Sequence, residues 1–213
     1  MKTVKLTTLT ALALALATGF ASAAGYKQAD KTGEAINTLR TDVSNIKIAV
    51  DNSMKALDAL AATASTNPRK AFEQFAKSVD KVEDAAEDAK KHAEKMRAKG
   101  AEYFKDWEKQ LSEVKSEEIR KLATERRAKL QETFGNIRKV TDEAKAAFTP
   151  FLANLKDLRT ALSADITVQG IDAAKGIFLK TKTSGAEVQK HLDGLITELN
   201  SVVASITAAK AKK

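Results

Sequence analysis

The sequence predicts an all-α protein, an elongated antiparallel four-helix bundle or coiled-coil rod that follows a cleaved signal peptide. The first observation is that apolar residues recur at alternating spacings of three and four in four successive blocks. This repeat places one narrow apolar stripe along one side of each helix, as in coiled coils. The second observation is that the blocks are joined by short connections, which favour antiparallel neighbours. The third is the absence of the alternating pattern that is typical of strands.

Residues 1–23 have the organisation of a secretory signal peptide. Lys2 and Lys5 precede an apolar stretch at residues 6–20, and small residues follow at 21–23; this order is typical of exported precursors. Removal of this segment with its two lysines would lower the formal charge from +8 to +6. We therefore expect an exported protein that resides in the periplasm. The chain contains no cysteine, which excludes disulfides and thiolate sites.

The bundle is expected over residues 24–208, followed by a lysine-rich tail at 209–213. Its helices are expected at about 28–64, 69–115, 117–162 and 165–208. The second helix has the most regular stripe, from Phe72 to Val114. Asn67 and Pro68 stand just before it, and both residue types favour the start of a helix.

The third and fourth helices have less regular patterns. Ser116 and the two glutamates after it favour a helix start, and Ser163 is the expected cap of the fourth helix. The third stripe contains Arg126 and takes an extra step of four near residues 137–141. Pro150 lies within this stripe without changing its phase, so we expect a kink rather than a break. Glycines such as Gly185 in the fourth helix require close packing to compensate for their low helix propensity.

No set of residues resembles a catalytic or metal site. A di-iron bundle needs Glu three residues before His, but Ala89 and Val188 occupy those positions before His92 and His191. We interpret both histidines as surface residues paired one turn back along their own helices, His92 with Asp88 and His191 with Glu187. Phosphate-loop, nucleophile-elbow and metalloprotease motifs are absent. We expect a non-enzymatic protein with no catalytic residue, cofactor or metal ligand.

An aromatic cluster near the end of the second helix is one candidate surface. It consists of Tyr103, Phe104, Trp107 and Leu111, which widen the apolar face there. These side chains either fill the core at the end of the rod or form a partner-binding tip.

Residues 115–140 form a second candidate surface, because they contain eight basic and four acidic side chains. The residues singled out there are Arg120, Lys121, Arg127, Lys129, Arg138 and Lys139. The simpler interpretation is a solvated helix face; the alternative is attraction to an acidic partner or an anionic envelope surface. Nucleic acid is not an expected partner, because the chain is expected to be exported and its few aromatic residues are assigned to the apolar stripes and not to a stacking surface among these cations.

Several segments resemble a bacterial exported family that is catalogued only as a domain of unknown function and has coiled-coil helices. The resemblance is carried by residues 101–108, 119–122, 148–152, 158–162 and 192–196. It implies an exported helical protein and supplies no catalytic residues. We expect a scaffold, adaptor or spacer that acts through an unknown protein partner or through self-association. The alternative is a binder of anionic membrane or envelope polymer that uses residues 115–140 and the C-terminal lysines.

Overall fold

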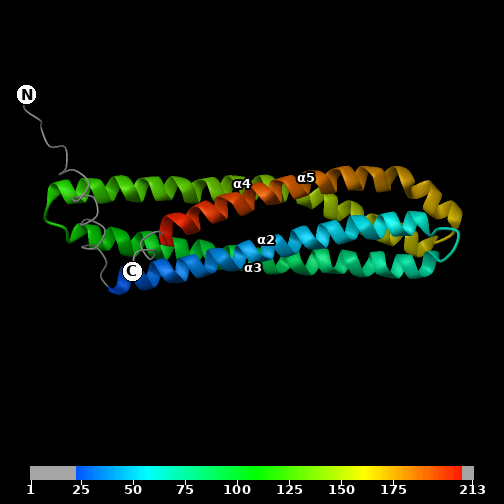
Figure 1. The fold of residues 1–213 in the computed structure, drawn as a ribbon, viewed down its shortest axis with the longest axis horizontal. Coiled ribbons are helices and arrows are strands. Elements are labelled where there is room, and N and C mark those ends of the chain that lie inside the picture. Colours follow the sequence, from blue (N-terminus) through cyan, green and yellow to red (C-terminus); the bar gives the residue numbers. More distant parts are fainter. Residues whose placement is uncertain (1–22, 208–213) are drawn as a thin grey trace, which may run out of the picture.

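The structure is a computed structural model that describes the backbone of residues 23–207 and the side chains of residues 27–206. Its four helices are α2 (Ala23–Ala62), α3 (Pro68–Ser112), α4 (Glu117–Ala164) and α5 (Val168–Thr207). They run alternately in opposite directions along one long axis (Figure 1). The predicted fold class, an antiparallel four-helix bundle, is confirmed, and residues 23–207 contain no strand. The expected signal peptide and lysine-rich tail lie outside the described residues, except for Ala23.

Two of the helix starts are capped as the sequence predicts. The Asn67 side chain accepts a hydrogen bond from the Lys70 backbone N–H at 3.4 Å, and Pro68 opens α3. The Ser116 hydroxyl accepts one from the Ile119 N–H at 3.4 Å, ahead of α4. Both side chains satisfy a backbone donor that the first helical turn leaves free.

The cap of α5 is different from the predicted one. Ser163 lies in the last turn of α4, where its hydroxyl donates to the Thr160 carbonyl at 2.7 Å. Thr167 instead accepts a hydrogen bond from the Gly170 N–H at 3.2 Å. Asp165 organises this connection by accepting from both the N–H and the hydroxyl of Thr167. The expectation was wrong because α4 continues through Ala164. The residue that caps α5 therefore lies further along the chain, at Thr167, directly before Val168.

The core runs along the bundle where the four apolar stripes meet. Its largest fully buried side chains are Phe75, Phe151, Ile36, Leu57, Leu60, Ile137, Leu155, Leu162, Ile171, Leu199, Val43 and Val50. Burial of each such side chain contributes about 1.5–3 kcal/mol relative to exposure. These residues come from all four helices, so the helices are held together as one unit.

Helix α4 continues through Pro150 without interruption, but its stripe differs in phase from the predicted one. Arg126 is exposed, whereas Arg127 is half-buried, and Phe134 packs against Phe104 with ring centroids 5.2 Å apart. With Arg127 and Phe134 in the stripe, the extra step of four falls at residues 119–127 and not at 137–141. The sequence left this choice open because a 3.5-residue repeat drifts slowly around a 3.6-residue helix.

Side chains of two other helices approach the backbone of α5 closely at Gly185. A Cβ atom at Gly185 would collide with the Met54 sulfur and would lie 3.0 Å from Cε2 of Phe151. Gly185 therefore allows α5 to pack closely on α2 and α4, as expected. Gly176 has no atom within 4 Å of the equivalent position, so this reason does not apply to it.

The helices differ in length and in how far they reach. Helix α4 has 48 residues, which corresponds to about 70 Å at 1.5 Å per residue. At the end that contains the α3–α4 connection, α3 and α4 extend beyond the described parts of α2 and α5 (Figure 1). None of the helices in the described residues has a segment long and apolar enough to cross a membrane.

Candidate interaction surface at the tip

The end of the rod formed by α3, α4 and their connection is called the tip here and comprises residues 101–129. Every residue of the tip is half-buried or exposed. Gly100 and Leu130, which flank it, are both buried. Among the described residues, α2 and α5 reach the tip at its base, where Gln28 donates to Glu102 and Arg126 donates to the Ser205 carbonyl. Beyond these contacts, the tip is a two-helix hairpin of α3 and α4.

The aromatic residues predicted from the sequence lie together at the base of the tip. Tyr103 contacts Phe104 and Trp107 in edge-on geometry, with centroid distances of 5.5 and 5.6 Å. Phe104 contacts Phe134 of α4 in the same way. Gly100 makes room for this ring, because a Cβ there would lie 2.9 Å from Phe134 Cε1. The cluster thus packs α3 against α4 and remains half-buried.

Burial also raises the pKa of the Tyr103 hydroxyl, and the positive charge of Arg126 opposes this effect. The tyrosine is therefore neutral at physiological pH. Arg126 donates from Nη2 to the Ser205 carbonyl of α5 at 3.2 Å. A cation at the C-terminal end of α5 is favoured by the helix dipole. Arg126 is exposed, so its charge reaches water although the residue was assigned to the apolar stripe.

Apolar side chains continue from the aromatic cluster to the end of the tip. Leu111 and Val114 of α3 are half-buried, as is Ile119 of α4. Leu122 is 47% exposed and is one of the few large apolar side chains in the described residues with such exposure. The apolar stripe therefore reaches the hairpin end with part of its surface in water.

Two of the predicted cations stabilise the tip itself. Arg120 donates from Nη2 and Nε to the Val114 carbonyl, at 2.6 and 3.2 Å, and so ties the α3–α4 connection to the first turn of α4. Arg127 donates to Glu108 across the hairpin at 2.9 Å. Its buried Nε has no hydrogen-bond partner among the described residues. Both arginines therefore have structural contacts that the sequence pattern did not indicate.

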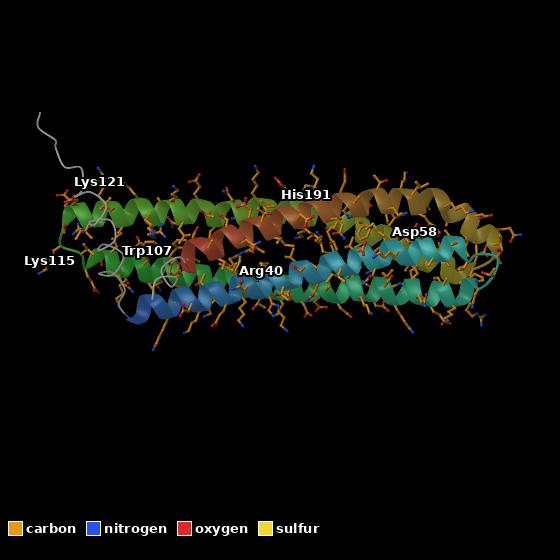
Figure 2. The ribbon with its side chains drawn as sticks, viewed as in Figure 1. Arg40, Asp58, Trp107, Lys115, Lys121 and His191 are labelled. Atoms are coloured by element: carbon orange, nitrogen blue, oxygen red, sulfur yellow. The ribbon has the colours of Figure 1, made fainter. Side chains whose placement is uncertain are left out.

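The other four predicted cations are exposed and unpaired. Lys121, Lys129, Arg138 and Lys139 make no hydrogen bond or ion pair within residues 27–206. Figure 2 shows Lys121 near the hairpin end, far from the middle of the rod. Arg138 and Lys139 line a shallow surface depression on α4 together with Gly135, Asp142, Glu143 and Ala146. The structure therefore does not bring all six basic residues into one site.

Folding also reduces the positive charge that the sequence shows in this region. Helix α3 places acidic residues beside the basic ones of α4, as in the pair of Glu108 with Arg127. Over the whole tip there are eight basic and seven acidic side chains. The surplus of residues 115–140 is thus nearly cancelled in three dimensions at the tip.

A histidine–aspartate pair inside the bundle was missed by the sequence analysis. His92 Nδ1 of α3 lies 2.7 Å from Asp42 Oδ2 of α2. The predicted pairing of His92 with Asp88 is therefore wrong, and His191 has no polar partner in the described part of the chain. Asp42 is 9% exposed, although it lies beside the predicted stripe. A local search along one helix overlooks such a pair because its members are 50 residues apart.

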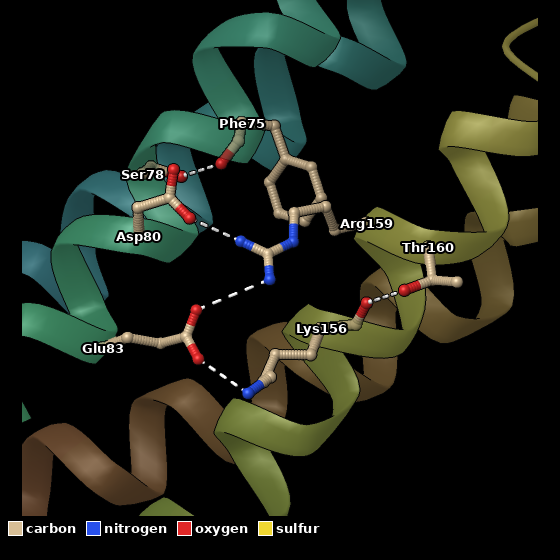
Figure 3. Close-up of polar contacts among 7 residues, drawn as sticks. All are labelled: Phe75, Ser78, Asp80, Glu83, Lys156, Arg159 and Thr160. Carbon is tan, nitrogen blue, oxygen red and sulfur yellow. Dashed lines mark hydrogen bonds and ion pairs between the residues drawn. The ribbon is translucent and has the colours of Figure 1, made fainter.

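A charge network joins α3 to α4 nearer the other end of the rod (Figure 3). Arg159 donates to Asp80 at 2.5 Å and to Glu83 at 3.5 Å. Lys156 donates to the other oxygen of Glu83 at 2.6 Å, and this hydrogen bond is the main reason that the pKa of Glu83 is lowered. These contacts hold α3 and α4 in register, so we interpret the network as structural and not as part of a catalytic site.

These features define the class of protein: a long antiparallel helical bundle in which α3 and α4 extend past the described parts of α2 and α5 at one end (Figure 1). No three His, Asp or Glu side chains within residues 27–206 are arranged to hold a metal ion. The chain belongs to the family described as protein of unknown function (DUF2959), which matches residues 21–209. Comparison with curated proteins and with solved structures finds no match.

Proposed function

We propose that this protein is a non-enzymatic helical adaptor or spacer that is exported to the periplasm and acts through protein–protein contacts. The core supports this proposal, since the four stripes fill the interior with apolar side chains. Buried polar side chains are few, and most of them bond within the bundle, as Thr32 does with the Gln28 carbonyl. A rod of this kind sets a distance between the molecules attached to it.

The main observation behind the proposal is the partly exposed apolar stripe of the tip. This stripe extends past the described parts of α2 and α5 (Figure 1), and Leu122 is 47% exposed at its end. Exposed apolar surface rimmed by charged residues is typical of protein–protein contact sites. The contacts are therefore proposed to be made mainly through the tip.

Site-specific photo-crosslinking in living cells tests this proposal. A photoreactive residue replaces Leu122 in one strain and Leu179 in a control strain; Leu179 is 69% exposed on α5, away from the tip. We expect discrete adducts in the envelope fraction from position 122 and few from position 179. Equal crosslinking at the two positions, or recovery of the protein only from the cytoplasm, would contradict the proposal.

A second candidate function is binding to an anionic membrane or envelope polymer. It is favoured by Lys121, Lys129, Arg138 and Lys139, which are exposed and unpaired within residues 27–206. Co-sedimentation with anionic vesicles at low and high salt tests it, because screening weakens contacts between exposed charges. Binding that falls with salt, and that is lost when these four cations become glutamine, would support this candidate. Sedimentation equal to that with neutral vesicles would exclude it.

A further inference from the structure

We infer that the tip is a homotypic interface, in which the hairpin of a second copy packs against residues 101–129 and the two rods are joined end to end. This inference rests on the proposed function, because it names the partner for the same surface. Continuity with the bundle is the main argument for it. Below the tip, α2 and α5 cover the stripes of α3 and α4 and complete four-helix packing.

The apolar stripes of α3 and α4 continue beyond the point where the described parts of α2 and α5 stop covering them. Trp107, Leu111 and Val114 continue the α3 stripe, and Ile119 and Ala123 continue that of α4. A second tip, related by a two-fold axis, supplies two antiparallel helices with the same stripe. Such self-complementary contact is the usual form of a two-fold interface, and it would extend four-helix packing across the junction.

The charge of the tip also fits a second copy. With eight basic and seven acidic side chains, two tips do not repel each other through net charge. An anionic surface gains little from a nearly neutral tip, since attraction of that kind requires a local surplus of positive charge.

The size of the tip limits the strength of the contact. A stable interface typically uses about 20–30 residues from each partner, and residues 101–129 provide that number only if most of them take part. We therefore expect a reversible dimer whose population depends on protein concentration.

Analytical ultracentrifugation and small-angle X-ray scattering test the inference on protein recovered from cells, with its N-terminus determined by mass spectrometry. Wild-type protein is expected to show a monomer–dimer equilibrium and, as the dimer forms, a maximum dimension that approaches twice that of the monomer. Leu122→Glu should raise the dissociation constant at least tenfold. Leu179→Glu, the matched control on α5, should leave it unchanged. Because both leucines are exposed, unchanged circular dichroism would show that the variants are folded.

Cysteine crosslinking provides a second readout, since the chain has no cysteine of its own. Leu122→Cys should form dimers with a short bifunctional maleimide at concentrations where Leu179→Cys does not. A protein that stays monomeric at all concentrations would overturn the inference, as would a dimer equally sensitive to both glutamate variants or one no longer than the monomer. In each case, in-cell adducts of position 122 with another protein would leave the proposed function standing, so the two can fail separately.

Discussion

His92 of α3 and Asp42 of α2 lie 2.7 Å apart, Nδ1 to Oδ2, across a helix interface that is otherwise mainly apolar. The aspartate side chain is 12% exposed and the histidine side chain 30%. His92 supplies the carboxylate with its one hydrogen-bond partner among the described residues. The pair fixes how α2 and α3 are aligned, because only one register brings these two side chains together.

Loss of one member of this pair should cost more than loss of both. His92→Leu leaves the Asp42 carboxylate without a donor, and we expect it to lower the free energy of unfolding by about 1–3 kcal/mol. The double variant Asp42→Leu/His92→Leu should be more stable than His92→Leu alone, because no unpaired polar group remains. Urea unfolding of the two single variants and the double variant measures the coupling. Additive effects would show that the contact has no energetic role.

Gly185 and Gly176 on α5 should respond oppositely to alanine. Alanine gains about 1 kcal/mol in helix propensity over glycine. At position 185 the added methyl group meets Met54 and the buried Phe151, and overpacking costs about 1–3 kcal/mol. We expect Gly185→Ala to lower the free energy of unfolding by about 1 kcal/mol and Gly176→Ala to raise it by up to that amount. Thermal and urea unfolding check both; a stabilised Gly185→Ala would show that Met54 and Phe151 move aside.

Glu83 should make bundle stability depend on pH in the acid range. Its hydrogen bond from Lys156 holds its pKa below the ordinary value of 4.5. The stabilisation is therefore complete above pH 4.5 and is lost as the pH falls through the lowered pKa. Partly exposed pairs contribute about 0.2–1 kcal/mol each, so Glu83→Gln should cost up to about 1 kcal/mol at neutral pH and much less once the pH has fallen below the lowered pKa of Glu83.

Glu87→Gln is a matched control for this pH dependence. Glu87 is an exposed glutamate one turn further along α3 and has no ion pair within residues 27–206. Its substitution should change the free energy of unfolding little at any pH. A Glu83→Gln effect that persists undiminished in acid would mean that packing of the side chain, and not its charge, is responsible.

Trp107 should report unfolding of the tip before the rest of the rod. It is the one tryptophan of the chain, and it belongs to a stretch in which every residue is half-buried or exposed. Segments with few buried apolar contacts open at lower free energy than the core. In urea titrations of dilute protein, the change in Trp107 fluorescence should precede the loss of helical circular dichroism. Coincident transitions would show that the tip and the core unfold together.

The sequence predicted the architecture well, because a heptad stripe is a local signal. Asn67, Pro68 and Ser116 were interpreted correctly at the helix starts, since a cap acts on residues three positions away. Pro150 was expected to remain inside one helix because apolar residues on both sides of it keep the same phase, and α4 does run through it.

Interactions between distant segments were beyond the reach of these patterns. The pairing of His92 with Asp42 depends on the register of α2 against α3, which the stripes leave undetermined by a turn or more. The choice between Arg126 and Arg127 depends on the direction of α4 at the tip, where the apolar signal is weakest. The near-neutral charge of the tip was overlooked because the range 115–140 omits the acidic side chains at the end of α3, such as Glu108, which the fold places beside α4.

In a bundle with an even number of antiparallel helices, the first helix begins and the last helix ends at the same end of the rod. The start of α2 and the end of α5 therefore lie toward the same pole as the α3–α4 hairpin (Figure 1). A fluorescent tag placed next to the start of α2 or the end of α5 would therefore stand near the hairpin and would mask the contacts that we propose for it. The turn at residues 63–67 occupies the opposite pole, so a small epitope inserted there is the better label for imaging the protein at work.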